Sequence, residues 1–147
     1  MKKIAIVTGS SLGIGAATAL KLASLDYYVF ALSRDYEKLK NIALKFPKNI
    51  EPYQIDITNY DEVNIFFKYL NNLPVDVLIN NAGISMRALF EDLDLNVIRK
   101  VMDTNFWGAV YCTKYALPSI LANKGSIVGI SSIAGKKGLP RRTGYSS

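Results

Sequence analysis

Residues 2–15 read KKIAIVTGSSLGIG, and residues 16–20 continue as AATAL. A short apolar run that ends in a glycine loop predicts a strand, a phosphate-sized turn and a helix, which is the layout of a dinucleotide site. Gly9 can form the tight turn, Gly13 lets the backbone approach a pyrophosphate, and Gly15 lets the helix pack closely on the strand. Phosphates bound there would meet the free N–H groups at the helix N-terminus.

The spacing of these glycines is G-x-x-x-G-x-G, whereas the best-known dinucleotide fingerprint is G-x-G-x-x-G. An ordinary turn between a strand and a helix is therefore a second interpretation of the same residues. Further motifs in the sequence are needed to choose between a dinucleotide site and an ordinary turn.

The composition is that of an ordinary globular protein. The chain has 147 residues, 50% of them apolar and 20% charged, which fits one domain over residues 1–147. Because neither a run of about eighteen apolar residues nor a signal peptide occurs, we expect a cytoplasmic protein with no membrane partner. The net charge of +6 suits a phosphate-rich cofactor. Nucleic-acid binding through Lys136, Lys137, Arg141 and Arg142 is the weaker alternative.

Two residue types restrict the chemistry. Histidine is absent, and Cys112 is the single cysteine. These counts exclude His-dependent triads and both His-based and thiolate metal sites, so we expect no bound metal. The neighbours of Cys112 indicate a buried helix position. Any acid–base chemistry must therefore use Tyr, Lys, Asp or Glu.

Apolar runs alternate with amphipathic segments along the whole chain. We predict strands at residues 4–7, 27–32, 50–57, 75–79 and 126–130. Helices are predicted after the glycine loop and at residues 35–46, 61–70 and 95–122, the last with a kink at Pro118. This order predicts an α/β protein: a Rossmann-like, doubly wound parallel sheet covered by helices on both faces, in three layers.

Ligands of such sheets bind at the carboxyl ends of the strands. Residues that directly follow predicted strands should therefore meet in one crevice, and these are Gly9, Arg34, Asp56, Asn81 and Ser132.

Several ordered motifs accompany the glycine loop: Asn80-Asn81-Ala82-Gly83, Asn105, Ile130-Ser131-Ser132 and Tyr145. With these motifs the chain resembles the short-chain dehydrogenase/reductase family over essentially all of its length. The resemblance implies that Tyr145 is the general acid/base and that Ser132 hydrogen-bonds the substrate oxygen, while the nicotinamide carries the hydride. It also implies that Asn105 organises a proton-relay water. From the residues alone, Asn105 could equally be a polar side chain satisfied inside a helix kink.

The end of the second predicted strand bears on the choice of cofactor. A carboxylate there would bind the ribose 2′-hydroxyl of NAD, whereas Ser33 and Arg34 suit the 2′-phosphate of NADP. We therefore expect NADP, with NAD less favoured. Two features speak against this: Leu12 stands where many NADP-using relatives have a basic residue, and Asp35 could pair with Arg34 as a surface ion pair.

The resemblance also implies the remaining cofactor contacts. Asp56 and Ile57 match the residues that contact adenine, and Asn81, Ala82 and Gly83 match those that line the adenosine ribose and steady the central strand. The complete set expected to bind the cofactor is Gly9, Ser11, Leu12, Gly13, Ile14, Gly15, Ser33, Arg34, Asp56, Ile57, Asn81, Ala82, Gly83 and Tyr145.

The family motif is Tyr-x-x-x-Lys, and the sequence stops at Ser147, before the lysine position. Relatives continue with further strands beyond the fifth, which complete the substrate pocket. We therefore expect residues 1–147 to be the cofactor-binding portion of a longer enzyme that lacks its C-terminal strands here, with residues 126–130 as an apolar edge strand.

These features lead to two hypotheses. The first is an NADP-dependent oxidoreductase that acts on a small carbonyl compound or secondary alcohol. The family resemblance implies that copies pair through residues 95–122, together with a helix that would begin near Tyr145, into a homodimer or homotetramer. The second is a dinucleotide-binding module without catalysis, because the lysine is not present. Residues 84–86 and 138–140 are expected to flank the substrate pocket and favour a mainly apolar ligand.

Overall fold

The computed structural model describes residues 2–70 and 73–147. In this part of the chain, strands align in one parallel sheet with the order β3-β2-β1-β4-β5. The strands are β1 (Ile4–Thr8), β2 (Tyr28–Ser33), β3 (Ile50–Gln54), β4 (Val75–Asn80) and β5 (Ser126–Gly129). The prediction of a parallel sheet is confirmed. β3 ends at Gln54, so Asp56 and Ile57 lie in the loop that follows it.

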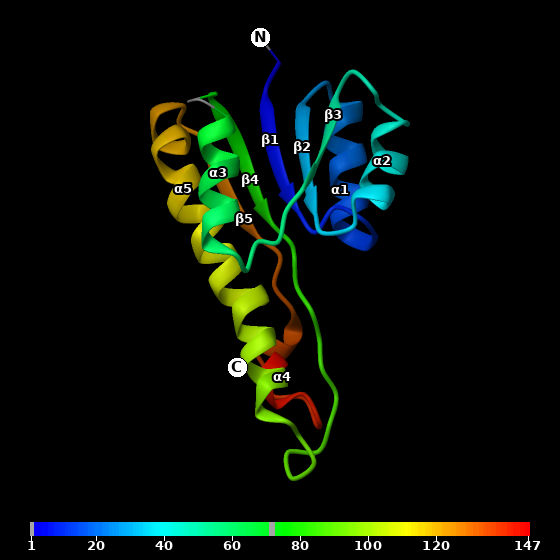
Figure 1. Ribbon diagram of the computed structural model, residues 1–147, viewed down its shortest axis with the longest axis vertical. Helices are drawn as coiled ribbons and strands as arrows, with labels where there is room; N and C mark the ends of the chain where they lie inside the picture. The colour runs from blue at the N-terminus through cyan, green and yellow to red at the C-terminus, as the bar shows by residue number, and fades with distance from the viewer. Residues whose placement is uncertain (1, 71–72) are drawn as a thin grey trace.

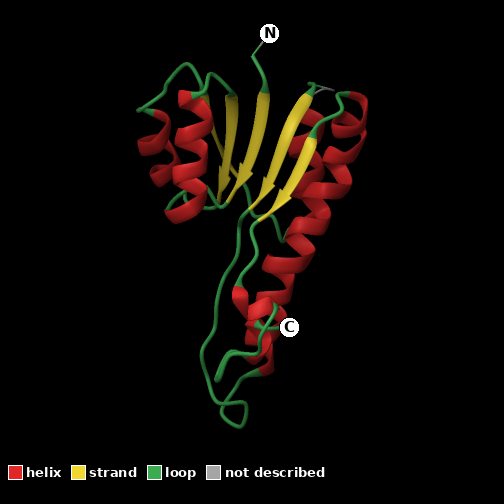
Figure 2. Ribbon diagram, turned by 180° about the vertical axis from the view of Figure 1, so that it is seen from behind, coloured by secondary structure: helices red, strands yellow, loops and turns green. Residues whose placement is uncertain are grey.

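Helices cover both faces of the sheet (Figures 1 and 2). On one side are α1 (Gly13–Ser24) and α2 (Tyr36–Ala43), and on the other are α3 (Tyr60–Tyr69) and α5 (Gly108–Ala122). The three-layer, Rossmann-like arrangement expected from the sequence is therefore confirmed.

The alternation of side chains along β1 explains the two faces. Ile4 and Ile6 point into the core under α3 and α5, whereas Ala5 and Val7 point into the core under α1 and α2. All four are buried. Cys112 of α5 lies in the first of these cores with no exposed surface, and burial raises the pKa of its thiol to about 12.

Two predicted helices differ from the structure. The segment predicted as a helix over 35–46 begins after Asp35, whose carboxylate accepts from the N–H of Lys38, and ends at Ala43, before Pro47. The single helix predicted over 95–122 is α4 (Leu95–Met102), a π-helical segment (Asp103–Trp107) and α5. α5 continues through Pro118 to Ala122, and the departure from α-helical hydrogen bonding lies instead at Asp103–Trp107.

The chain extends well beyond the carboxyl ends of the strands. Figure 1 shows α4, the segment that leads to it and the C-terminal segment lying together below the sheet. The C-terminal segment contains the short 3-10 helices Ile133–Gly135 and Thr143–Tyr145. It is held against the rest of this extension by a hydrogen bond from the N–H of Ala88 to the carbonyl of Arg141, and by Gly144, which packs on Ile98.

No helix within residues 2–70 and 73–147 combines the length and the apolar character needed to cross a membrane.

Candidate dinucleotide and catalytic site

The glycine loop between β1 and α1 adopts the conformations that its sequence predicts. Gly9 and Gly13 have φ angles of 67° and 60°, in the left-handed region that favours glycine. At Gly15 an added methyl group would lie 2.3 Å from the carbonyl oxygen of Gly9. The start of α1 therefore packs at van der Waals distance against the loop residue Gly9, whereas the sequence predicted close packing on the strand itself.

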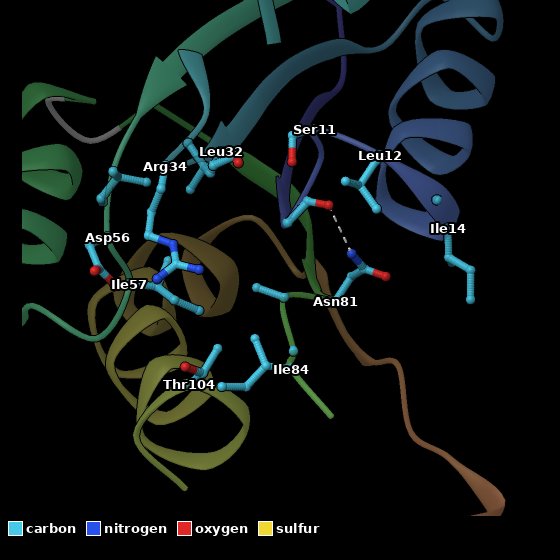
Figure 3. Close-up of a pocket in the computed structure, with 16 residues that line it drawn as sticks. Ser11, Leu12, Ile14, Leu32, Arg34, Asp56, Ile57, Asn81, Ile84 and Thr104 are labelled. Carbon is cyan, nitrogen blue, oxygen red and sulfur yellow. Dashed lines mark hydrogen bonds between the residues drawn. The ribbon is translucent and has the colours of Figure 1, made fainter. Parts of the chain in front are cut away.

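Thr8 and Asn81 fasten the glycine loop to the end of β4. The Thr8 hydroxyl oxygen accepts hydrogen bonds of 3.0 Å from the backbone N–H groups of Asn81 and Ala82. The Asn81 amide donates to the carbonyl oxygens of Thr8 (2.9 Å) and Gly9 (3.3 Å; Figure 3). Sequence analysis gave Thr8 no role of its own; the signal that was available is its position between a buried strand and the first glycine of the loop.

A cleft of about 380 Å³ opens at the carboxyl ends of β1, β2 and β4 (Figure 3). Most residues expected to bind the cofactor line it: Gly9, Ser11, Leu12, Gly13, Ile14, Ser33, Arg34, Asp56, Ile57, Asn81, Ala82 and Gly83. Gly15 lies behind the cleft, in contact with its wall. Four lining residues were not predicted to contact the cofactor, namely Leu32, Ile55, Ile84 and Thr104. Leu32, Ile55 and Thr104 directly precede predicted site residues, and Ile84 was expected at the substrate pocket instead.

Arg34 extends its side chain from the end of β2 into the cleft, on the side of Ile57 (Figure 3). Its carbonyl oxygen accepts a hydrogen bond of 3.0 Å from Gln54 of β3. Asp35 does not pair with Arg34. Its carboxylate lies 2.7 Å from the ammonium of Lys38, and the hydrogen bond with this ammonium holds the pKa of Asp35 below its usual value. Arg34 is therefore free of the competing ion pair that the sequence left open.

A second cleft of about 380 Å³ adjoins the first and shares Ile14 and residues 81–84 with it. Asn105, Ser132 and Tyr145, the three residues expected to be catalytic, all line this cleft. Ser132 follows β5, and its hydroxyl oxygen accepts from the N–H of Ala134 at 3.2 Å. Side chains separated by long stretches of sequence thus meet at one end of the sheet.

Asn105 lies in the π-helical segment, and both ends of its side-chain amide bind the same residue. Its oxygen accepts from the N–H of Ile84 at 2.8 Å, and its nitrogen donates to the carbonyl oxygen of Ile84 at 2.9 Å. The side chain is therefore satisfied at an irregular point of the helix, which was one of the two interpretations of its sequence. It fixes the position of the strand-end loop that the two clefts share.

Within the described ranges, no three or more His, Cys, Asp or Glu side chains come together as metal ligands would. The polar groups of the two clefts are hydroxyls, amides, backbone groups and Arg34, together with the carboxylate of Asp56. The Asp56 carboxylate accepts hydrogen bonds from the Thr58 hydroxyl, at 2.8 Å, and from the Thr58 N–H.

Comparison with known proteins identifies the family. The model of the short chain dehydrogenase family matches residues 3–147. The chain therefore belongs to the short-chain dehydrogenase/reductase family. It is 36% identical to dehydrogenase/reductase SDR family member 7B of Xenopus laevis, over 98% of this chain and 48% of the relative. It thus spans about half the length of that curated relative.

Two solved structures show the same fold with a cofactor or a cofactor derivative. ElxO with NADP bound has a TM-score of 0.90 and 38% identity, over 99% of this chain and 62% of ElxO. An alcohol dehydrogenase from the archaeon Thermococcus sibiricus, complexed with 5-hydroxy-NADP, has a TM-score of 0.93 and 26% identity, over 99% of this chain and 65% of that one.

Proposed function

We propose that this protein is an NADP-dependent oxidoreductase that interconverts a carbonyl compound and the corresponding alcohol. The observation that carries the proposal is the adjacency of the two clefts. One is lined by the residues that would bind a dinucleotide, the other by Asn105, Ser132 and Tyr145, and they share residues 81–84. A dinucleotide lying in the first cleft would reach the second, where the acid–base groups lie.

The residues of the first cleft fit a dinucleotide. A methyl group added at Gly13 would meet no atom within 4 Å, so the backbone there is open to a phosphate. Gly13 and Ile14, the first residues of α1, line the cleft, and the free N–H groups of a helix N-terminus favour negative charge. Asn81 and Thr8 hold the loop in this conformation before any ligand arrives, which lowers the entropic cost of binding.

The proposed reaction would use groups of both the cofactor and the protein. NADPH, when bound, supplies the hydride that reduces the carbonyl carbon. Ser132 would donate a hydrogen bond to the carbonyl oxygen, and Tyr145 would transfer its phenolic proton to that oxygen as negative charge develops on it. Asn105 would act as a positioning residue through its two hydrogen bonds to Ile84. Oxidation of the alcohol would use the same groups in reverse.

The preference for NADP rests on the end of β2. Arg34 projects into the cleft without a carboxylate partner among the described ion pairs, and Ser33 adds a hydroxyl beside it. A guanidinium and a hydroxyl suit the 2′-phosphate that distinguishes NADP from NAD. ElxO, 38% identical to this chain, has been solved with NADP bound.

Titration of the purified chain with NADPH and with NADH tests the cofactor assignment. Arg34→Gln should weaken NADPH binding by about tenfold to a hundredfold, the loss expected for a charge-assisted hydrogen bond, and should leave NADH binding nearly unchanged. Lys45→Gln, at an exposed position just after α2 and outside both clefts, is the control that also removes one positive charge. Equal weakening of both cofactors by Arg34→Gln would contradict the assignment, and absence of dinucleotide binding would contradict the whole proposal.

Turnover tests the catalytic roles. Tyr145→Phe should abolish carbonyl reduction and retain NADPH binding, because the ring stays and only the proton donor is lost. Full activity of Tyr145→Phe would contradict its role as the acid. NADPH binding without turnover of any carbonyl compound would instead support a dinucleotide-binding module without catalysis.

We also propose that copies of the chain pair through the helical segment Leu95–Met102 to Gly108–Ala122. The exposed side of this segment carries large apolar side chains, among them Phe106, Trp107, Leu117 and Leu121. Such a surface is typical of an interface. Sedimentation analysis of the protein should show a dimer or tetramer, and a stable monomer at micromolar concentration would contradict this.

A further inference from the structure

Arg142 lies just before the Thr143–Tyr145 turn and contacts two residues of the second cleft, although it is not itself among the residues that line this cleft. Its Nη1 donates a hydrogen bond of 2.5 Å to the hydroxyl of Ser85, and its guanidinium carbon lies 5.7 Å from the centre of the Tyr145 ring. Ser85 and Tyr145 both line the cleft that contains Ser132. The guanidinium therefore lies beside two residues of the cleft in which a substrate carbonyl would be bound.

The backbone fixes Arg142 in this position. Its carbonyl oxygen accepts hydrogen bonds from the N–H groups of Tyr145 (3.0 Å) and Ser146 (2.9 Å). The preceding residue, Arg141, is joined by its carbonyl oxygen to the N–H of Ala88 at 2.9 Å. Arg142 thus lies where the C-terminal segment is bound to residues 84–88, and its side chain is half-buried there.

The positive charge of Arg142 has no carboxylate partner in the described part of the chain. The ion pairs found there join Lys2, Lys38 and Lys40 to acidic residues elsewhere on the surface. No Asp or Glu lines the catalytic cleft, and none occurs in residues 130–147. A guanidinium has five N–H donors, and the Ser85 hydroxyl uses one of them.

We propose that the substrate carries an oxyanion group, a carboxylate or a phosphate, a few bonds from its reacting carbonyl, and that Arg142 binds this group. A planar guanidinium binds such groups through paired, charge-assisted hydrogen bonds, and this one stands beside two residues of the cleft. The inference rests on the proposed function, since it concerns the substrate of the same site. It changes the expectation of a mainly apolar ligand. Of the residues expected to flank the substrate pocket, only Ile84 and the polar Ser85 are among those that line this cleft, and Ser85 binds the cation of Arg142.

Binding can be tested without turnover. The NADP⁺-saturated protein, which has no hydride to transfer to a carbonyl, would be titrated with 3-oxobutanoate and with its methyl ester, and in a second arm with hydroxyacetone phosphate and with hydroxyacetone. Each anionic probe should bind about tenfold to a hundredfold more tightly than its neutral partner. The arm with the larger ratio identifies carboxylate or phosphate as the group. The nuclear magnetic resonance signal of the Arg142 Nε–H should shift with the anionic probes alone.

Variants separate charge recognition from a structural role. Arg142→Gln should remove the advantage of the anionic probes and leave the neutral ones unchanged, while Arg142→Lys should keep part of it. Arg141→Gln removes a neighbouring exposed charge and should alter neither. Equal binding of charged and neutral probes, absence of binding by the anionic probes, or an advantage retained in Arg142→Gln would overturn the inference.

The two proposals can fail separately. Without dinucleotide binding, the proposed function fails before any substrate probe is used. With NADPH bound normally and no discrimination between charged and neutral probes, only the role of Arg142 fails. In the full-length enzyme, loss at Arg142 should appear as a higher KM for the anionic substrate, whereas a merely structural defect would lower kcat for charged and neutral substrates alike.

Discussion

Gly15 is a single position at which stability and cofactor binding depend on the absence of a side chain. A methyl group there would lie 2.3 Å from the Gly9 carbonyl oxygen and 2.4 Å from the Asn81 amide nitrogen. Gly15→Ala should therefore lower the free energy of unfolding by about 1–3 kcal/mol and weaken NADPH binding, because the loop must move. Urea unfolding and cofactor titration measure the two effects.

The matched control is Gly129→Ala, where the added methyl group would meet no atom within 4 Å. It should change neither quantity. A Gly15→Ala protein with normal stability and normal NADPH binding would show that the loop does not pack as described.

Tyr28 makes the free energy of unfolding depend on pH in the alkaline range. Burial, together with the hydrogen bond of 2.6 Å from its hydroxyl to Glu51, raises the pKa of Tyr28 to about 12. A raised pKa means that the neutral phenol is favoured in the folded state. The resulting stability is present below the ordinary tyrosine pKa of 10.0 and is lost as the pH rises from there toward about 12.

Unfolding of wild type and Tyr28→Phe across this range measures the effect. The variant should be less stable at neutral pH, where it lacks the hydrogen bond, and the gap should narrow by about 1 kcal/mol toward pH 12, after allowance for the partial exposure of the ring. Tyr69 also donates a hydrogen bond to Glu51 and has a raised pKa. Because Tyr69 is present in both proteins, the difference between them reports the contribution of Tyr28. A constant gap would argue against this account.

At the scale of residues, sequence was a good guide where the amino-acid type itself carries the constraint. The left-handed conformations at Gly9 and Gly13 and the close packing at Gly15 follow from the absence of a side chain. Contacts between distant segments, such as Arg142 with Ser85, have no local signature. The sequence suggested Arg34 as a possible partner of Asp35, and the pairing with Lys38 was not predicted.

At the scale of elements, Asn105 joins the π-helical segment Asp103–Trp107 to the loop that follows β4. Asn105→Ala should lower the free energy of unfolding by about 2 kcal/mol, because both backbone groups of Ile84 lose their partner. Asn105→Asp keeps the acceptor for the N–H of Ile84 and should fall between wild type and the alanine variant. Thermal unfolding of the three proteins measures the order of their stabilities. Asn96→Ala, on exposed α4, serves as the control and should be close to wild type.

Helices were predicted well where the pattern of apolar residues sets their packing, and less well where tertiary hydrogen bonds intervene. The apolar residues of 95–122 have a helical period, which correctly predicts helical conformation but not the change of hydrogen bonding at Asp103–Trp107. That change accompanies the binding of Asn105 to Ile84, a loop residue far away in sequence. The end of α2 at Ala43 was similarly misjudged, because the apolar pattern runs on into the following turn.

At the scale of the whole molecule, the alternation of strands and helices predicts the parallel sheet and its two helical layers, because a crossover between parallel strands must cover a face. The order β3-β2-β1-β4-β5 required the structure, since sequence does not state to which side of β1 each crossover returns. β5 forms one edge of this sheet, and Ile127 and Val128 are 39% and 40% exposed there.

The buried thiol of Cys112 can be used to measure the stability of the core. Because the sulfur is enclosed between sheet and helix, a disulfide reagent can react with it only while that core is open. Labelling in native buffer should therefore be slow, and its rate relative to the unfolded chain gives the free energy of opening. Saturation with NADPH should slow labelling in proportion to cofactor occupancy, and NADH should do so less. Rapid labelling at a rate that NADPH does not change would mean that the core opens without disturbing the nucleotide cleft. The labelling rate of Cys112 therefore reports both the stability of the core and the preference between the two cofactors.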